Sequence, residues 1–178
     1  ETAPIFPYLY LKIFPTKKKI FPTKNNSLFD GNDFLFKKSI EGIKIYGEYG
    51  CGLSSKWMLK NTNCKVISVD SSKEWVEKIK NENKKYESRL KINHVDLGKV
   101  RRWGFPISYD NFRNFPDYTD YIWKQSERPK LVLVDGRFRV CCFLTSLKFA
   151  EAGTKIIFDD YVNSPHYHFI EKYVSRIN

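Results

Sequence analysis

A glycine turn between two short apolar segments determines the expected architecture of this chain. The apolar segment at 43–46 leads into Glu-Tyr-Gly-Cys-Gly at 48–52, and a helix-forming segment follows at 54–61. The second apolar segment, 66–69, ends at Asp70. A strand, a glycine turn, a helix and a second strand ending in a carboxylate form the layout of a nucleotide-type cofactor site. Glycine lets the backbone turn sharply and approach a ligand, and a carboxylate can accept hydrogen bonds from both ribose hydroxyls. The sequence therefore predicts a binder of a nucleoside cofactor.

The remainder of the chain alternates between strand and helix patterns. We expect five strands at 43–47, 66–70, 90–95, 131–134 and 155–158, with helices at 54–61, 73–87, 138–152 and 166–176. Continuous apolar strands separated by helices indicate a mostly parallel sheet covered on both faces. Right-handed crossovers then give a doubly wound α/β fold with three α/β/α layers. For a doubly wound sheet of the Rossmann type we expect the strand order 3-2-1-4-5.

The first 40 residues differ from the rest. Ile-Phe-Pro-Thr-Lys occurs at 13–17 and again at 20–24, and prolines break regular structure there. We expect an N-terminal extended arm with a short helix over residues 1–40, followed by one α/β domain over residues 41–178.

Composition limits the kind of protein. The 178 residues are 42% hydrophobic and 16% aromatic, which suits one folded domain. No apolar segment approaches the roughly 18 residues of a membrane span, no signal peptide is evident, and the four cysteines form no metal-finger spacing. We therefore expect a cytoplasmic protein with free thiols and no membrane association. The net charge of +11 keeps nucleic-acid binding open, although the lysines are scattered.

Acidic residues gather where a doubly wound sheet binds ligands, beyond the carboxyl ends of its strands. One follows each expected strand: Glu48, Asp70, Asp96, Asp135 and the pair Asp159-Asp160. The turn disfavours a dinucleotide, because Ser55 replaces the third glycine and Glu48 would repel a pyrophosphate. A cofactor with a cationic amino acid end and an adenosine end fits better.

These motifs resemble class I S-adenosylmethionine-dependent methyltransferases. Glu48-x-Gly50-x-Gly52 is similar to their first motif, residues 94–97 (His-Val-Asp-Leu) lie where the family binds adenine, and residues 134–139 (Val-Asp-Gly-Arg-Phe-Arg) fall at the fourth motif. With Phe-Asp-Asp-Tyr at 158–161, the chain resembles a little-characterised methyltransferase-like group, and also the metal-dependent sugar and catechol O-methyltransferases. The resemblance covers about residues 43–176.

The resemblance implies a Rossmann-like enzyme that binds S-adenosylmethionine. The implied cofactor contacts are Glu48 to the methionine amino group, Asp70 to the ribose, Asp96 to the adenine, and Gly50, Gly52 and Ser54 in the turn. Sheets of this family add two strands after the fifth. We expect these C-terminal strands, 6 and 7, to be missing and the domain to be truncated, which leaves a sheet edge through which an oligomer could form.

The implied reaction is methyl transfer to a small molecule, with oxygen as the nucleophile. Asp135, Asp159 and Asp160 offer the hard oxygen ligands that Mg²⁺ prefers, and the ion would orient substrate oxygens and lower the pKa of a hydroxyl. Without a metal, Asp135 would contact the substrate directly and Asp159 would cap the last helix.

Further catalytic candidates are Arg137 and His166, beside Asp135 and Asp159. Arg137 cannot deprotonate and so cannot be the base, but it suits a clamp for a carboxylate or phosphate; an ion pair with Asp159 or Asp160 is the alternative. His166, ahead of His168, is a candidate for acid–base work or metal binding, and a capping or surface role is its alternative.

Two features leave other functions open. The aromatic residues at 103–123 would stack on a planar substrate or a single-stranded base, pack over the sheet edge, or form a lid at 103–106. The rival functions are an NAD-linked oxidoreductase, and a non-catalytic nucleic-acid or partner-binding module on a degenerate methyltransferase fold.

Overall fold

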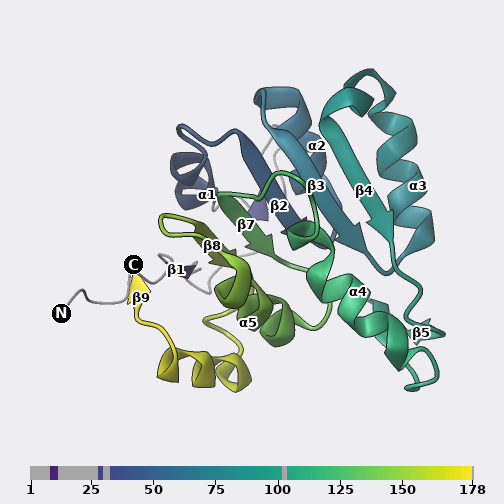
Figure 1. The fold of residues 1–178 in the computed structure, drawn as a ribbon, viewed down its shortest axis with the longest axis vertical. Coiled ribbons are helices and arrows are strands. Elements are labelled where there is room, and N and C mark those ends of the chain that lie inside the picture. Colours follow the sequence, from purple (N-terminus) through teal and green to yellow (C-terminus); the bar gives the residue numbers. More distant parts are fainter. Residues whose placement is uncertain (1–8, 12–27, 30–32, 102–103, 178) are drawn as a thin grey trace.

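The chain forms an α/β fold with a parallel sheet (Figure 1). A computed structural model describes residues 9–11, 28–29, 33–101 and 104–177. In these residues the main sheet has seven strands, ordered β4-β3-β2-β7-β8-β1-β9 and paired in parallel. The strands are β1 (Leu9–Leu11), β2 (Ile45–Tyr49), β3 (Lys65–Asp70), β4 (Leu90–His94), β7 (Leu131–Val134), β8 (Lys155–Phe158) and β9 (Arg176–Ile177).

Helices cover both faces of this sheet. They are α1 (Phe34–Ser39), α2 (Leu53–Asn61), α3 (Lys73–Glu82), α4 (Phe115–Asp120) and α5 (Arg139–Phe149), with 3₁₀ segments η2 (Lys84–Arg89), η4 (Phe112–Asn114), η5 (Tyr121–Trp123) and η6 (Pro165–Lys172). A small antiparallel hairpin, β5 (Val100–Arg101) with β6 (Phe105–Pro106), lies outside the main sheet. None of the described helices is both long and apolar enough to cross a membrane.

Side chains along each strand point alternately to the two faces of the sheet, and helices pack on both faces to give three α/β/α layers. In β7, Leu131 and Leu133 pack in a core with residues of α1 and α2, whereas Val132 and Val134 pack in the core with α4, η5 and α5. All four are fully buried, because successive strand side chains point to opposite faces and both faces are covered. Figure 1 shows α4 and α5 on the near side of the sheet.

The predicted order of the five central strands is confirmed. The segments expected as strands one to five are β2, β3, β4, β7 and β8, and their observed order, β4-β3-β2-β7-β8, corresponds to 3-2-1-4-5. The sheet is thus of the Rossmann-like type.

The expectation that the sheet stops at the fifth strand is wrong. β1 pairs with β8, with Tyr10 opposite Ile157, and β9 pairs with β1, with Tyr10 opposite Ile177. β1 supplies partners for backbone groups that would otherwise be unpaired at the β8 edge, and β9 does the same for β1. They are only two or three residues long, too short for a periodic sequence pattern. The repeats at 13–24 lie outside the described residues, whereas α1 lies where the short helix of the arm is expected; the boundary at residue 40 stays a prediction.

Several helices end earlier than their patterns predict. The helix expected over 73–87 ends at Glu82, because the side chain of buried Asn83 donates to the carbonyl of Ile79 (2.8 Å) and the chain continues as η2. The helix expected at 138–152 ends at Phe149, and the last predicted helix, 166–176, is instead the 3₁₀ segment η6.

Candidate functional site

The turns that follow β2 and β7 pack directly against each other. Gly50 has φ +91°, and its N–H donates to the carbonyl of Val69 (2.8 Å). A Cβ on Gly50 would lie 2.9 Å from the backbone of Gly136, and a Cβ on Gly136 would lie 2.1 Å from the hydroxyl oxygen of Tyr118. Only glycine fits at either position, so the two turns are held together at the carboxyl edge of the sheet.

Glu48 lies beneath the glycine turn. β2 continues to Tyr49, so the prediction that Glu48 follows the first strand is wrong. The strand directs its carboxylate to the α2 face, where it is fully buried. Tyr46 (2.9 Å), Ser54 (2.7 Å) and Ser55 donate their hydroxyls to it. Burial raises the pKa of Glu48, and these hydroxyl donors oppose the rise. The structure therefore shows Glu48 and Ser54, both predicted cofactor contacts, bonded to each other in support of the turn.

Asp70 ties the glycine turn to the next loop. It is the last residue of β3, and its two carboxylate oxygens accept from the backbone N–H groups of Cys51 (2.8 Å) and Ser72 (2.7 Å). The side chain is partly exposed. Because each carboxylate oxygen can accept about two hydrogen bonds, Asp70 keeps acceptor capacity for the hydroxyls of a ligand.

Asp96 is exposed and lies two residues past the end of β4. Its side chain accepts from the N–H of Gly98 (2.9 Å), and its carbonyl accepts from the side-chain amide of Asn114 (2.8 Å). These bonds fix the loop that leads from β4 into the β5–β6 hairpin.

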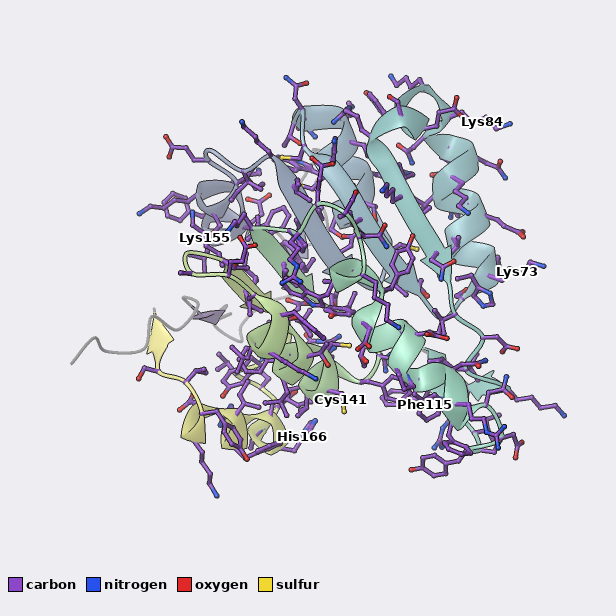
Figure 2. All side chains as sticks on the ribbon, in the orientation of Figure 1. Lys73, Lys84, Phe115, Cys141, Lys155 and His166 are labelled. Carbon is purple, nitrogen blue, oxygen red and sulfur yellow. The ribbon has the colours of Figure 1, made fainter. Side chains whose placement is uncertain are left out.

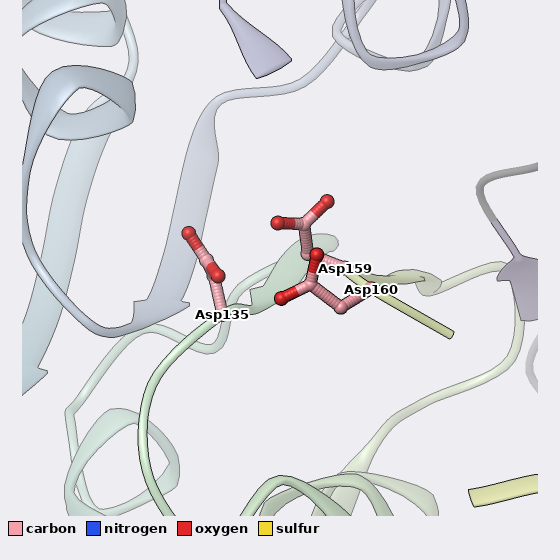
Figure 3. Close-up of side chains that lie close together, drawn as sticks. All are labelled: Asp135, Asp159 and Asp160. Atoms are coloured by element: carbon pink, nitrogen blue, oxygen red, sulfur yellow. The ribbon is translucent and has the colours of Figure 1, made fainter. Parts of the chain in front are cut away.

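Three carboxylates meet at the ends of β7 and β8 (Figure 3). We call Asp135, Asp159 and Asp160 the carboxylate cluster; one oxygen from each lies within 4.8 Å of the others. Asp160 has φ +57°, an uncommon backbone conformation for a residue other than glycine. Burial and the neighbouring charge of Asp159 raise the pKa of Asp135 to about 8, and Arg139 opposes this rise. The cluster can therefore hold a proton or a divalent cation.

Arg139 bridges the carboxylate cluster. Its guanidinium bonds to Asp135 Oδ1 (2.9 Å), Asp160 Oδ2 (3.0 Å) and the carbonyl oxygens of Asp159 (2.6 Å) and Gly136 (3.2 Å). The side chain is only 9% exposed. The sequence suggested an ion pair of Arg137 with Asp159 or Asp160 as an alternative, and the role of Arg139 was missed. The spacing of four residues from Asp135 at the start of α5 could have identified it.

Arg137 has a different environment. It is half-buried, its guanidinium carbon lies 4.2 Å from the ring centroid of Phe105, and its backbone N–H donates to the Tyr118 hydroxyl (3.0 Å). A Cβ on Gly104 would lie 2.8 Å from Ser71 Oγ and 3.6 Å from Arg137 Cγ. The hairpin at 104–106 thus lies across Arg137, whereas Trp103, assigned to the predicted lid, is outside the described residues.

The two histidines of η6 are separate from the carboxylate cluster. His168 Nε2 lies 3.0 Å from the carbonyl of Tyr161, and exposed His166 packs against the ring of Tyr167 at 4.1 Å between centroids. Figure 2 shows His166 on η6. Within the described part of the chain, the one group of potential metal ligands is the carboxylate cluster, which includes neither histidine.

Two cavities lie at the opposite, amino end of the sheet. One of about 590 Å³ is lined by Lys44, Asn61 and Asn63 among others, and one of about 150 Å³ is lined in part by Arg89; both include Lys65. None of the predicted site residues lines either cavity. The two cavities therefore lie at the end of the sheet opposite to Asp70 and the carboxylate cluster.

The comparisons with known proteins agree with the fold. No family model and no curated protein matches the chain. A solved structure that does match is a methyltransferase-like protein from Silicibacter pomeroyi, which is 29% identical to this chain. The match covers 78% of this chain and 75% of that one, with a TM-score of 0.65. This similarity supports a methyltransferase fold for the chain.

Proposed function

We propose that the protein transfers a methyl group from S-adenosylmethionine to an oxygen of a small molecule. The observation that carries this proposal is the direct packing of the turns after β2 and β7, where Gly50 and Gly136 meet. Through this contact Asp70 and the carboxylate cluster belong to one edge of a methyltransferase-like sheet. A cofactor on the first turn and an acceptor at the second would then be neighbours.

The residues at the first turn fit a nucleoside cofactor. Asp70 has acceptor capacity for the ribose hydroxyls, and a Cβ on Gly52 would meet no atom within 4 Å, so the turn is open in front of it. Exposed Asp96 would accept from the adenine. The bound cofactor supplies a methyl group activated on a sulfonium centre. Glu48 supports the turn from below through Ser54 and Ser55.

The carboxylate cluster would position the acceptor. Methyl transfer depends on in-line placement of the nucleophile, which a fixed cluster at two adjacent strand ends can provide. With a pKa of about 8, Asp135 is mostly protonated at neutral pH, and its ionised form, which can accept a proton from a hydroxyl, increases as the pH rises through 8. When Asp135 is ionised, three carboxylates against the single cation of Arg139 leave net negative charge that suits Mg²⁺. The ion would act as a Lewis acid on the acceptor oxygen.

Calorimetry with S-adenosylhomocysteine tests this proposal. We expect the wild-type protein to bind it, and Asp70→Asn to weaken binding at least tenfold, because the ribose would lose charge-assisted hydrogen bonds. Asp117→Asn makes the same change at an exposed acid of α4 and should leave affinity unchanged. Absence of heat with wild type, or equal affinity of Asp70→Asn, would contradict the proposal.

Calorimetric titrations with NADH and with nucleic acid distinguish the rival functions. Binding of NADH in place of S-adenosylhomocysteine would indicate an oxidoreductase. Salt-dependent binding of nucleic acid without cofactor affinity would indicate a binding module on this fold. A cytoplasmic location and association through the sheet edge remain predictions.

A further inference from the structure

Two arginines on one turn have opposite surroundings. Arg139 is almost fully buried and saturated by oxygen atoms of the strand ends. Arg137, two residues earlier, enters none of the ion pairs found among the described residues, although the carboxylate cluster adjoins it in sequence. The cluster is therefore neutralised in part by Arg139, and the charge of Arg137 is left available.

The environment of Arg137 is costly for an unpaired cation. The guanidinium is half-buried and stacks on Phe105 at 4.2 Å. Removing a charge from water without a partner costs free energy that a bound anion would return. Because the guanidinium is planar and forked, carboxylate and phosphate groups match it with two parallel hydrogen bonds.

The backbone fixes where this cation lies. The Arg137 N–H donates to the buried Tyr118 hydroxyl, and Gly136 is wedged between Tyr118 and Gly50. Phe105 is 51% exposed and Arg137 is half-buried, so solvent reaches the stacked pair. Asp135 and Arg137 flank the same glycine. An anion at Arg137 and a hydroxyl at the carboxylate cluster could thus belong to one small molecule.

We propose that Arg137 binds a carboxylate or phosphate group of the methyl acceptor, with Phe105 holding the plane of the guanidinium. The assignment to a methyl acceptor rests on the function proposed above, whereas the anion site itself does not. The acceptor class is accordingly a hydroxylated small molecule that carries a carboxylate or phosphate.

Calorimetric titration with benzoate and with phenyl phosphate, each with and without saturating S-adenosylhomocysteine, tests this site. We expect wild type to bind at least one of the two anions, and the stronger of the two identifies the anion chemistry. Phenol, which lacks the anionic group, should bind at least tenfold more weakly. Arg137→Gln should weaken anion binding at least tenfold and leave the affinity for S-adenosylhomocysteine unchanged. Arg137→Lys keeps the charge and loses the forked guanidinium, so its affinity for the anion should lie between those of wild type and Arg137→Gln.

The matched control is Arg113→Gln, the same change at an exposed arginine of η4, which should bind like wild type. Thermal unfolding of each variant establishes that it is folded. The proposal is overturned if Arg137→Gln binds both anions as wild type does, if phenol binds equally well, or if wild type binds neither anion. If S-adenosylhomocysteine fails to bind while the Arg137-dependent anion site is found, the proposed function fails and the anion site stands.

Discussion

The carboxylates at the glycine turn after β2 and those of the carboxylate cluster have different kinds of hydrogen-bond and ion-pair partners. At the first turn, Glu48 and Asp70 are held by neutral donors, namely hydroxyls and backbone N–H groups. At the carboxylate cluster, three acids share one arginine, and the pKa of Asp135 rises to about 8. The difference indicates that neutral donors hold the acids of the first turn, with Asp70 keeping acceptor capacity for a ligand, whereas the carboxylate cluster retains excess negative charge. A ligand cation is therefore expected at the carboxylate cluster.

The largest expected effect comes from removing the one cation of the cluster. Arg139→Met should lower the free energy of unfolding by about 3 kcal/mol, the low end for breaking a buried ion pair, because Asp160 is mostly exposed. Urea unfolding measures the loss. Arg128→Met, which removes an exposed arginine bonded to the carbonyl of Phe149, is the control and should cost far less. An equal cost for both variants would contradict the bridging role.

The contact between the two turns should be nearly as sensitive. Gly136→Ala should destabilise the protein by about 2 kcal/mol, because its Cβ would collide with the Tyr118 hydroxyl and the Gly50 backbone. Gly52→Ala is the control, since a Cβ there meets no atom within 4 Å. Thermal unfolding compares them, and similar melting temperatures for the two variants would disprove the close packing.

A divalent cation should stabilise the cluster in wild type. Mg²⁺ at ten times its dissociation constant should add about 1.4 kcal/mol of stability, measured as a rise in melting temperature. Asp160→Asn should reduce this rise, and asparagine tolerates the left-handed backbone of that position. Asp117→Asn should respond to Mg²⁺ as wild type does. An undiminished rise in Asp160→Asn would place the ion elsewhere.

The smallest effect concerns Glu48 and pH. The pKa of Glu48 is raised in the folded state, so the folded protein keeps a proton that the unfolded chain has lost. Wild-type stability should then fall as pH rises above the ordinary value of 4.5 toward the folded pKa. Glu48→Gln cannot ionise and should lack this contribution, while differing from wild type by about 1 kcal/mol near neutral pH. Identical pH slopes in urea unfolding from pH 4.5 to 8 would contradict the burial-induced shift.

The sequence predicted the central sheet because its strands are continuous apolar segments bounded by turns. β7 and β8 were predicted with their observed bounds, and the strand order is the one expected of a doubly wound sheet of the Rossmann type. β1 and β9 were missed because two or three residues carry no periodicity. These strands depend on pairing with distant segments, which a local pattern does not reveal.

The sequence predicted which residues form the candidate site better than it predicted the contacts that their side chains make. The grouping of Asp135, Asp159 and Asp160 followed from the ends of neighbouring parallel strands. The burial of Glu48 was missed because β2 extends two residues further than predicted. Glu48 therefore lies within the strand, and its side chain points into a covered face of the sheet. The separate environments of Arg137 and Arg139 depend on tertiary packing against Phe105 and Asp160.

The most direct test of the proposed cofactor site is a crystal structure of the protein with S-adenosylhomocysteine. We expect the ligand at the carboxyl edge of the sheet, with its ribose hydroxyls within hydrogen-bond distance of Asp70 and its sulfur directed toward the carboxylate cluster. Ligand density instead in the amino-end cavity beside Asn61 and Asn63, away from Asp70, would contradict it.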